Sequence, residues 1–380
     1  MKVFNWVKGE GLRVKGERLR VKGEGCRVKG EGGVFLLCLI ILLSACQKPV
    51  EPEEGTPIMN AAAKGVYILN EGVFNMNNSS ISLYDFATGK ITEDYFLQVN
   101  KRRLGDTGND LQKYGNKLYA VVNMSEQIEV MHFSDCRSIK QIPLIGKQPR
   151  KIAFYGNKAY VSCFDGDVVQ IDTATLQVEK MVYSGENPEG ICVVNEKLYV
   201  ANSGGVNYPN YGNTVSVFDI HTLVLLKTIE VVANPYTLIP DREGDVYLVS
   251  RGNYADIPYS FQRIDSRSDE VVHNYNLPVL NFTISGDYGY LYYYNFETQT
   301  SWIKVMDMIS ESIVKENFIA DGTKINCPYG ITINPINQDV YISDSHQYTV
   351  NGDVYCFDKN GKQKFRFEVG INPAKVVILE

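Results

Sequence analysis

Histidine is scarce in this sequence, and the side-chain arrangements that most enzymes require are missing. Only four histidines occur among 380 residues. Three of them, His132, His221 and His273, fall in or beside predicted strands and turns, and no two have the spacing of metal ligands. Nucleophile elbows, paired catalytic carboxylates and phosphate-binding glycine loops are also absent. We therefore expect a protein that is not an enzyme, with no catalytic residues, no metal site and no cofactor.

Clustered positive charge is lacking as well. The chain carries 44 acidic against 38 basic side chains, and residues 1–45 hold nine of the Lys/Arg and four of the Glu. Removing this +5 from the net charge of −6 leaves −11 for residues 46–380, whose longest basic run is Lys101-Arg102-Arg103. An acidic surface repels phosphate backbones, so we expect no binding to nucleic acid.

No apolar run is long enough to span a bilayer as a permanent helix. The longest, residues 34–43, has ten apolar residues and is typical of the core of a secretory signal peptide. Before it, residues 1–33 repeat a Val-Lys-Gly-Glu unit every seven residues, but the frequent glycines disfavour a coiled coil. We interpret this repetitive leader as a segment that is not part of the mature protein.

A cysteine directly follows the apolar run. The Leu-Ser-Ala-Cys at positions 43–46 resembles the lipobox of bacterial lipoproteins, which implies that residues 34–45 are a signal peptide and that Cys46 carries the lipid. Residues 46–64 are polar and rich in Pro and Glu, as in a flexible tether. Their acidic residues between 51 and 54 resemble the export signals that send some Gram-negative lipoproteins to the outer face. The resemblance implies an outer-membrane protein, held by its lipid alone and exposed at the cell surface.

Five cysteines remain after Cys46, at positions 136, 163, 192, 327 and 356. An odd number spread along the chain does not predict a disulfide framework, and three of the five lie within strand patterns, where cysteine usually fills space in a core. One bridge stays open as an alternative, because the cell envelope is an oxidising compartment.

A strand centred on tyrosine recurs seven times in the rest of the chain. Its copies are Val66–Leu69, Leu118–Val121, Ala159–Ser162, Leu198–Ala201, Val246–Val249, Leu291–Tyr294 and Val340–Ser343. Each is followed by a strand of alternating polarity that usually ends in Asp, and most are preceded by a short strand that opens with Pro. This order predicts β-meanders, and a period near 45 residues predicts the blades of a propeller.

The two ends of the repeat array predict how a ring would close. The first repeat, at Val66, lacks a leading strand, and the chain ends with one at residues 372–379. Pairing the two removes the edges that an open sheet would leave. We therefore predict an all-β fold: one seven-bladed β-propeller over residues 65–380, with four-stranded blades and closure by the C-terminal strand. The departures at His132 and at residues 279–281 make blades two and six the least regular.

The repeat resembles that of the YVTN-type β-propellers over nearly the whole mature chain. The segments most similar to the family pattern are Asn187–Ile191, Leu198–Asn202 and Val215–Asp219. The resemblance implies a propeller of the same architecture.

The candidate ligand-binding residues lie in loops that the propeller places on one face. Five loops between second and third strands are long: Asn70–Ser80, Asn202–Thr214, Arg251–Ser260, Asn295–Trp302 and Ser343–Asp353. With one adjoining link, they supply Phe74, Asn75, Arg103, Tyr208, Tyr211, Arg251, Tyr254, Tyr259, Phe296, Trp302, His346 and Tyr348. Aromatic rings among amides suit a large ligand with polar edges. The open alternative is that these rings fold back over the tops of the blades.

Four further segments, with the lipobox, resemble a narrower group: Gly65–Gly72, Asn75–Ser80, Arg103–Asp110 and Val122–Ser125. The group is that of the DUF5074-type surface lipoproteins, which include BtuG-type cobalamin-binding proteins. This resemblance implies that the loop face binds cobalamin or another corrinoid and passes it to a TonB-dependent outer-membrane transporter.

The residues alone leave other functions open. One is a scaffold that docks envelope proteins or glycans without a small-molecule pocket. Another is a propeller lactonase or lyase, which needs acids and histidines at the central channel, where the loops offer only His346. The segment Asp106–Asp110 resembles a calcium loop but lacks its regular ligand alternation, so we interpret it as a turn that links two blades.

Overall fold

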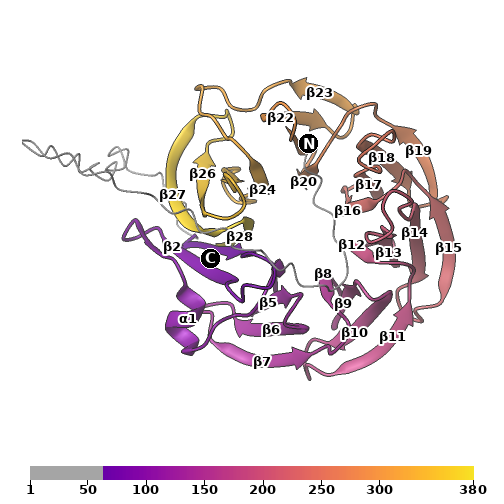
Figure 1. Ribbon diagram of the computed structural model, residues 1–380, viewed down its shortest axis with the longest axis horizontal. Helices are drawn as coiled ribbons and strands as arrows, with labels where there is room; N and C mark the ends of the chain where they lie inside the picture. The colour runs from indigo at the N-terminus through magenta and orange to yellow at the C-terminus, as the bar shows by residue number, and fades with distance from the viewer. Residues whose placement is uncertain (1–62) are drawn as a thin grey trace, which may run out of the picture. The chain divides into compact units, whose positions relative to one another are not determined.

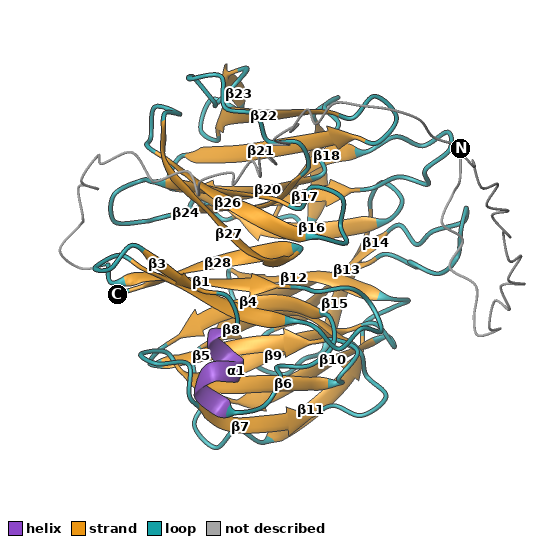
Figure 2. Ribbon diagram, turned by 60° about the vertical axis from the view of Figure 1, so that its left-hand side comes forward, coloured by secondary structure: helices purple, strands orange, loops and turns teal. Residues whose placement is uncertain are grey.

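Residues 63–380 of the computed structural model are described below; the predicted leader, the signal peptide, the lipidation site at Cys46 and nearly all of the tether lie outside the described residues. Seven four-stranded antiparallel sheets surround a central axis and form a β-propeller, which confirms the predicted fold (Figure 1). The described residues contain one α-helix, α1 (Tyr95–Asn100), between blades 1 and 2 (Figure 2). Among them, no helix has the length and apolar character needed to cross a bilayer.

Each blade runs outward from an inner strand at the central axis. Blade 1 consists of β28 (Pro373–Leu379), β1 (Gly65–Asn70), β2 (Ser80–Asp85) and β3 (Lys90–Thr92). Blades 2 to 4 are β4 (Gly108–Tyr114), β5 (Lys117–Val122), β6 (Gln127–His132), β7 (Ser138–Pro143); β8 (Pro149–Tyr155), β9 (Lys158–Cys163), β10 (Asp167–Asp172), β11 (Val178–Tyr183); and β12 (Pro188–Val194), β13 (Lys197–Asn202), β14 (Thr214–Asp219), β15 (Leu225–Glu230). Blades 5 to 7 are β16 (Pro235–Pro240), β17 (Asp245–Ser250), β18 (Ser260–Asp265), β19 (Glu270–Asn274); β20 (Asn281–Ser285), β21 (Tyr288–Asn295), β22 (Thr300–Asp307), β23 (Ser312–Lys315); and β24 (Pro328–Ile333), β25 (Val340–Asp344), β26 (Asn351–Phe357), β27 (Gln363–Ile371).

The repeated tyrosine is a core residue at the centre of every second strand. Its seven copies, Tyr67, Tyr119, Tyr160, Tyr199, Tyr247, Tyr292 and Tyr341, are each at most 2% exposed. Seven apolar clusters surround them, one between each pair of adjacent blades. The tyrosine recurs because a large ring is needed to fill the space between two sheets.

Two copies of this tyrosine give a matched test of the buried hydroxyl. The Tyr160 hydroxyl donates to the Ile220 carbonyl at 3.0 Å, whereas the Tyr67 hydroxyl has no hydrogen-bond partner among residues 63–380. We expect Tyr160→Phe to lower the free energy of unfolding by about 1–2 kcal/mol, since a buried hydrogen bond is lost. Tyr67→Phe should change it by less than about 0.5 kcal/mol or raise it, because only an unsatisfied group is removed. Equal losses in urea unfolding would contradict this assignment.

The buried tyrosines also predict the response of the fold to alkali. Burial raises the pKa of Tyr119 and of Tyr247 to about 12. Because the folded pKa lies above the unfolded value, this contribution to stability is complete below about pH 10 and is lost as the pH rises towards 12. In a titration followed at 295 nm, exposed tyrosines should ionise first and the buried ones together with loss of the near-UV circular dichroism. Ionisation of all tyrosines near pH 10 with an unchanged near-UV spectrum would refute the prediction.

The ring is closed by the C-terminal strand, as predicted. Strand β28 pairs with β1 in antiparallel register, with Val377 opposite Tyr67 and Val376 opposite Ile68. Beyond the ladder, the Lys64 amide donates to the Leu379 carbonyl at 2.6 Å. The inner edge of blade 1 is therefore covered by residues more than 300 positions away in the chain.

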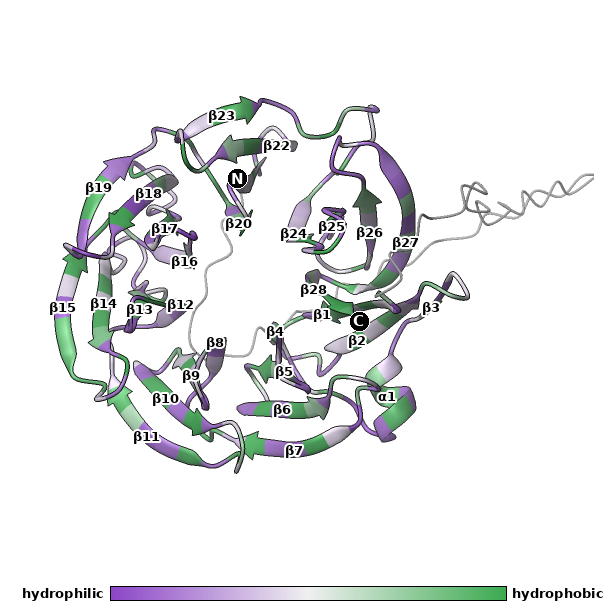
Figure 3. Ribbon diagram, turned by 180° about the vertical axis from the view of Figure 1, so that it is seen from behind, coloured by the Kyte–Doolittle hydropathy of each residue, from purple (hydrophilic) through white to green (hydrophobic). Residues whose placement is uncertain are grey.

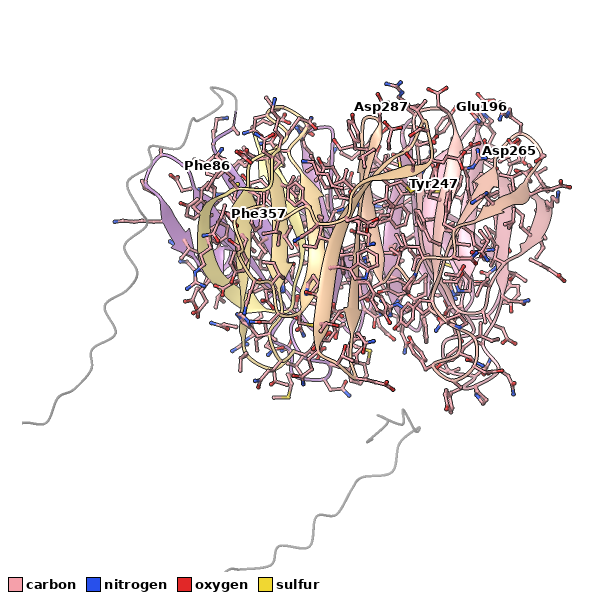
Figure 4. The ribbon with its side chains drawn as sticks, turned by 90° about the horizontal axis from the view of Figure 1, so that it is seen from above. Phe86, Glu196, Tyr247, Asp265, Asp287 and Phe357 are labelled. Atoms are coloured by element: carbon pink, nitrogen blue, oxygen red, sulfur yellow. The ribbon has the colours of Figure 1, made fainter. Side chains whose placement is uncertain are left out.

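The two faces of the ring differ in their connections. The turns between first and second strands and between third and fourth strands lie on one face, which we call the turn face. Glu196 and Asp287 belong to these turns, and both lie along one edge of the ring in Figure 4. The loops between second and third strands and the links between blades lie on the other, which we call the loop face.

A repeated hydrogen bond joins the links to the loops at the loop face. The residue before the inner strand has a positive φ between 49° and 61° in five blades: Thr107, Gln148, Asn187, Asn234 and Asn372. Its carbonyl accepts from the amide of the first residue after the second strand of the same blade, at 2.8–3.1 Å. Asparagine tolerates the left-handed conformation better than most residues, which explains the recurrent Asn-Pro.

Three local features differ from the sequence-based expectation. The predicted loop from Asn295 to Trp302 is shorter, because β22 begins at Thr300 and Trp302 pairs with Tyr293 across the hairpin. Cross-strand aromatic pairs stabilise a hairpin and here lengthen it. Inner strand β20 begins at Asn281 rather than Val279. Helix α1 was not predicted; its N-terminus is capped by the Asp94 carboxylate, which accepts from the Leu97 amide at 3.0 Å.

The cysteines of the described part of the chain are all buried and unpaired: Cys136, Cys163, Cys192, Cys327 and Cys356. Burial raises the pKa of the Cys327 thiol, as it does for the other four. The disulfide left open by the sequence is therefore not formed, and these residues fill space between the blades.

Candidate functional site on the loop face

Six aromatic rings form a continuous row across three blades of the loop face. We call it the aromatic row: Tyr208 and Tyr211 of blade 4, Tyr254 and Tyr259 of blade 5, and Tyr293 and Trp302 of blade 6. Successive ring centroids lie 6.3, 5.8, 6.1, 5.6 and 5.9 Å apart. Five of the six were expected from the sequence to bind ligand. Tyr293 was not, because it lies inside a predicted strand.

The rings of the row meet edge to face, except for the tilted pair of Tyr293 and Trp302. Edge-to-face pairs are stabilised by about 0.5–1.5 kcal/mol beyond their buried area. Two of the rings nevertheless remain open to solvent, Tyr208 at 53% and Tyr254 at 51% exposed, whereas the other four are partly buried. The rings of the row therefore stabilise one another through their edge-to-face contacts and still present exposed ring faces to a ligand.

The loop of blade 5 holds Tyr254 in an uncommon backbone conformation, with φ at 56°. The Asn253 side chain builds this turn: its oxygen accepts from the amides of Ala255 and Ile257 at 3.0 and 2.8 Å, and its amide donates to Asp256 at 2.7 Å. A bulky residue in the left-handed region costs about 1–2 kcal/mol. Such strain is concentrated at functional sites, where it fixes a side chain in place.

A second aromatic group continues onto blade 7. Phe296 stacks on Tyr348 with centroids 6.4 Å apart and an interplanar angle of 23°. Tyr348 in turn meets Tyr329 of inner strand β24 at 5.8 Å. The structure thus brings together two further predicted residues and connects them to the centre of the ring.

His346 is held between two carboxylates. Its Nε2 lies 3.1 Å from an Asp353 oxygen and its Nδ1 lies 3.5 Å from an Asp344 oxygen. Asp344 is fully buried and also accepts from the amides of Asn326 and Cys327, at 2.7 and 2.9 Å. Within residues 63–380, no three or more His, Cys, Asp or Glu side chains are grouped to hold a metal ion. The imidazole therefore fixes the loop of blade 7.

The remaining predicted residues lie over blades 1 and 2, away from the row. Phe74 and Asn75 are exposed in the loop after β1. The Asn75 amide donates to Asp106 at 3.1 Å, and Arg103 donates to the Asn77 carbonyl at 3.3 Å. Asp106 also accepts from the Asn77 amide at 2.9 Å, so this carboxylate binds the backbone of the neighbouring loop.

A polar ring at the mouth of the central axis was not predicted from the sequence. Its members, which we call the mouth ring, are Glu71, Asn109, Arg150, Glu189, Tyr236 and Tyr329. Arg150 binds Glu189 through two hydrogen bonds of 2.8 and 2.9 Å and donates to Asn109 at 2.9 Å. Asn109 donates to Glu71 at 3.2 Å, and the Tyr329 hydroxyl donates to the other Glu71 oxygen.

The mouth ring does have a signal in the sequence. Arg150, Glu189, Tyr236 and Tyr329 each directly follow the proline that opens an inner strand. The fifth such proline, Pro373, is followed by Ala374. A position that is polar or aromatic in four of five copies of an otherwise apolar repeat indicates a side chain that faces the axis, because a core position would be uniformly apolar.

Arg251 connects the mouth ring to the aromatic row. It is the first residue after β17, and its amide donates to the Asn234 carbonyl at 2.8 Å. Its guanidinium carbon lies 3.4 Å from the centroid of the Tyr236 ring. Burial lowers the pKa of Arg251, but Tyr236, Tyr254 and Tyr259 outweigh it, so that the pKa is raised overall. A cation therefore lies between the centre of the ring and the exposed tyrosines.

These features define the chain as a seven-bladed β-propeller whose long, aromatic loops gather on one face. It belongs to the family described as domain of unknown function DUF5074, whose model matches residues 64–377. Comparison with curated proteins gives no match.

Solved structures similar to this chain share its fold at low sequence identity. A quinonprotein alcohol dehydrogenase-like protein from Bacteroides thetaiotaomicron is 14% identical, with a TM-score of 0.63, over 84% of this chain and 79% of that one. Hydrazine synthase from Kuenenia stuttgartiensis is 17% identical, with a TM-score of 0.56, over 67% and 77%. The computationally designed protein Ika8 is 11% identical, with a TM-score of 0.54, over 82% and 96%. At such identities the similarity concerns the fold alone.

Proposed function

We propose that this chain is a non-enzymatic binding protein whose loop face holds a large organic ligand, most simply a corrinoid such as cobalamin. The observation that carries the proposal is the aromatic row, six rings over three blades with Arg251 at its inner side. Ring faces and tyrosine hydroxyls suit a broad ligand that combines apolar surface with amide edges.

The state of the acids at the mouth ring supports binding rather than catalysis. Glu189 is 6% exposed and is bound through both oxygens by Arg150. Glu71 accepts from Asn109 and Tyr329. A general acid or base needs a carboxylate free to exchange a proton with substrate, and both of these are engaged by the protein itself.

The proposed setting is the outer membrane. The lipobox at Cys46 favours a lipid anchor, and delivery of the ligand to a TonB-dependent transporter is the role that the family resemblance suggests. Expression of the full chain should place it in the membrane fraction, and Cys46→Ala should release it from that fraction. Equal membrane association of both forms would refute the anchor.

Titration of the mature protein, from residue 46, with cyanocobalamin in a calorimeter tests the ligand. We expect saturable binding, and a loss of at least tenfold in affinity for Tyr211→Ser combined with Tyr254→Ser, since each lost stacking contact is worth about 1 kcal/mol. Tyr288→Ser is the matched control, because Tyr288 is exposed on the turn face. No heat at micromolar protein would refute the corrinoid proposal.

A scaffold is the second candidate, and the outer strands favour it. Tyr183 of β11 is 65% exposed, and Leu225 and Leu226 of β15 are 51% and 52% exposed. Figure 3 shows β15 as an outer strand in which apolar and polar residues are mixed. Exposed apolar side chains on an edge strand are typical of a docking surface. Crosslinking in intact cells distinguishes a scaffold from a ligand-binding protein. Capture of a transporter that depends on Leu225 and Leu226 and does not require the ligand would favour the scaffold.

A further inference from the structure

Among residues 63–380, Arg251 differs from the other partly buried arginines in having no anionic partner. Arg150 is paired with Glu189, and Arg102 is paired with Glu129 at 2.9 Å. Among residues 63–380, the Arg251 guanidinium has no ion pair or hydrogen bond, and its Nε is buried without a partner. Arg251 is partly buried, and a cation withdrawn from water without an anion is costly, so proteins usually pair such groups.

The surroundings of Arg251 favour its charged form but supply no anion of its own. Its guanidinium stacks on Tyr236, and the other rings that act on its charge are those of Tyr254 and Tyr259. The acid that acts on it is Glu189, but both oxygens of that carboxylate already accept from Arg150. A stacked guanidinium keeps its N–H donors in the plane of the group, where they are available to a planar or tetrahedral anion.

The backbone holds this arginine in place before any ligand arrives. The amides of Arg251 and Gly252 donate to the carbonyls of Asn234 and Ala233, at 2.8 and 3.0 Å. Gly252 has a φ of 63°, and a Cβ at this position would lie 2.0 Å from the Ile257 carbonyl oxygen, so the loop turns back on itself directly after Arg251. With its backbone fixed in this way and its guanidinium over the Tyr236 ring, the side chain loses little further freedom on binding.

We propose that Arg251, with Tyr236, Tyr254 and Tyr259, forms an anion subsite that takes a phosphodiester or carboxylate group of the ligand. The inference rests on the proposed function in that the same face binds the ligand, and it adds the chemical group that the ligand must carry. The anion binds the guanidinium, while the body to which it is attached stacks on the aromatic row.

The first test does not depend on the identity of the ligand. The mature protein is titrated with phenyl phosphate and with phenol, followed by one-dimensional NMR of the probe. We expect saturable binding of phenyl phosphate that is at least tenfold weaker in Arg251→Gln, and weaker binding of phenol that does not change. Arg267→Gln is the control, because that arginine lies at the surface beside Asp265. Equal binding of phenyl phosphate by wild type and Arg251→Gln, or no binding by wild type, overturns the proposal.

The conservative variant Arg251→Lys tests whether weaker binding comes from the lost guanidinium rather than from a loss of fold. Arg251→Lys keeps the charge but not the planar fork, so it should weaken phenyl phosphate binding by threefold to tenfold with an unchanged near-UV spectrum. Full binding by Arg251→Lys together with full binding by Arg251→Gln would also overturn the subsite.

The second test separates the subsite from the corrinoid proposal. Cyanocobalamin carries a phosphodiester that dicyanocobinamide lacks. We expect Arg251→Gln to weaken binding of cyanocobalamin at least tenfold and that of dicyanocobinamide by less than threefold. If both corrinoids bind the variant as they bind wild type, the subsite is wrong and the function stands. If neither binds wild type, the corrinoid is wrong and the phenyl phosphate titration still decides the subsite.

Discussion

Deletion of residues 373–380 is expected to abolish the folded propeller. Strand β28 is the inner strand of blade 1 and buries Val376, Ile378 and Leu379 between neighbouring blades. Each such side chain contributes about 1.5–3 kcal/mol when buried. Their joint loss, with that of the ladder to β1, is comparable to the net stability of a typical protein, about 5–15 kcal/mol. We expect aggregation in size-exclusion chromatography and loss of the near-UV circular dichroism.

Addition of the missing strand as a peptide provides the control. A synthetic peptide of residues 372–380 should restore part of the folded monomer, because the strand is held by a ladder and by packing rather than by chain connectivity. The single substitution Val376→Asp should lower the melting temperature without removing the strand. A deletion variant that stays monomeric with a native near-UV spectrum would show that closure by β28 is dispensable.

Glu189→Met is expected to lower the free energy of unfolding by about 3 kcal/mol, because it leaves the Arg150 guanidinium in the mouth ring without its carboxylate. The double variant Arg150→Met with Glu189→Met should recover most of this loss, since neither member of the pair is left without the other. The difference between the single and double variants in urea unfolding measures the penalty of the isolated charge.

The surface pair of Arg267 and Asp265 is the matched control for this cycle. The Arg267 side chain is 78% exposed, so that Arg267→Met should change stability by less than about 0.5 kcal/mol. A Glu189→Met variant as stable as wild type would mean that the mouth ring does not depend on its ion pair. A double variant less stable than Glu189→Met would mean that the two side chains contribute mainly through packing.

The sequence predicted the ring well because its signal is repeated. Each copy of the Tyr67 position must fill the same space between two sheets, so the pattern appears seven times in register. The closing strand followed from the count, since one repeat lacked its first strand and Pro373 opened another at the end of the chain. The exact ends of strands were harder to predict from the sequence, as at Trp302, where a cross-strand contact lengthens the hairpin.

The candidate site was predicted as a set of loops rather than as an arrangement. The row depends on the turn that holds Tyr254 at a positive φ, and nothing in the order of residues fixes which neighbouring ring it meets. The mouth ring joins residues about 40 positions apart, such as Arg150 and Glu189, across the boundary between blades. Such pairs become visible only when the blades are placed side by side.

The position of Lys64 shows at which face of the ring the chain enters the propeller. Its carbonyl accepts from the Phe86 amide at 3.0 Å, in a turn between third and fourth strands, so the chain enters the ring at the turn face. The proposed anchor at Cys46 would therefore be connected to the face opposite the aromatic row, so that the anchor and the proposed ligand site belong to different sides of the ring.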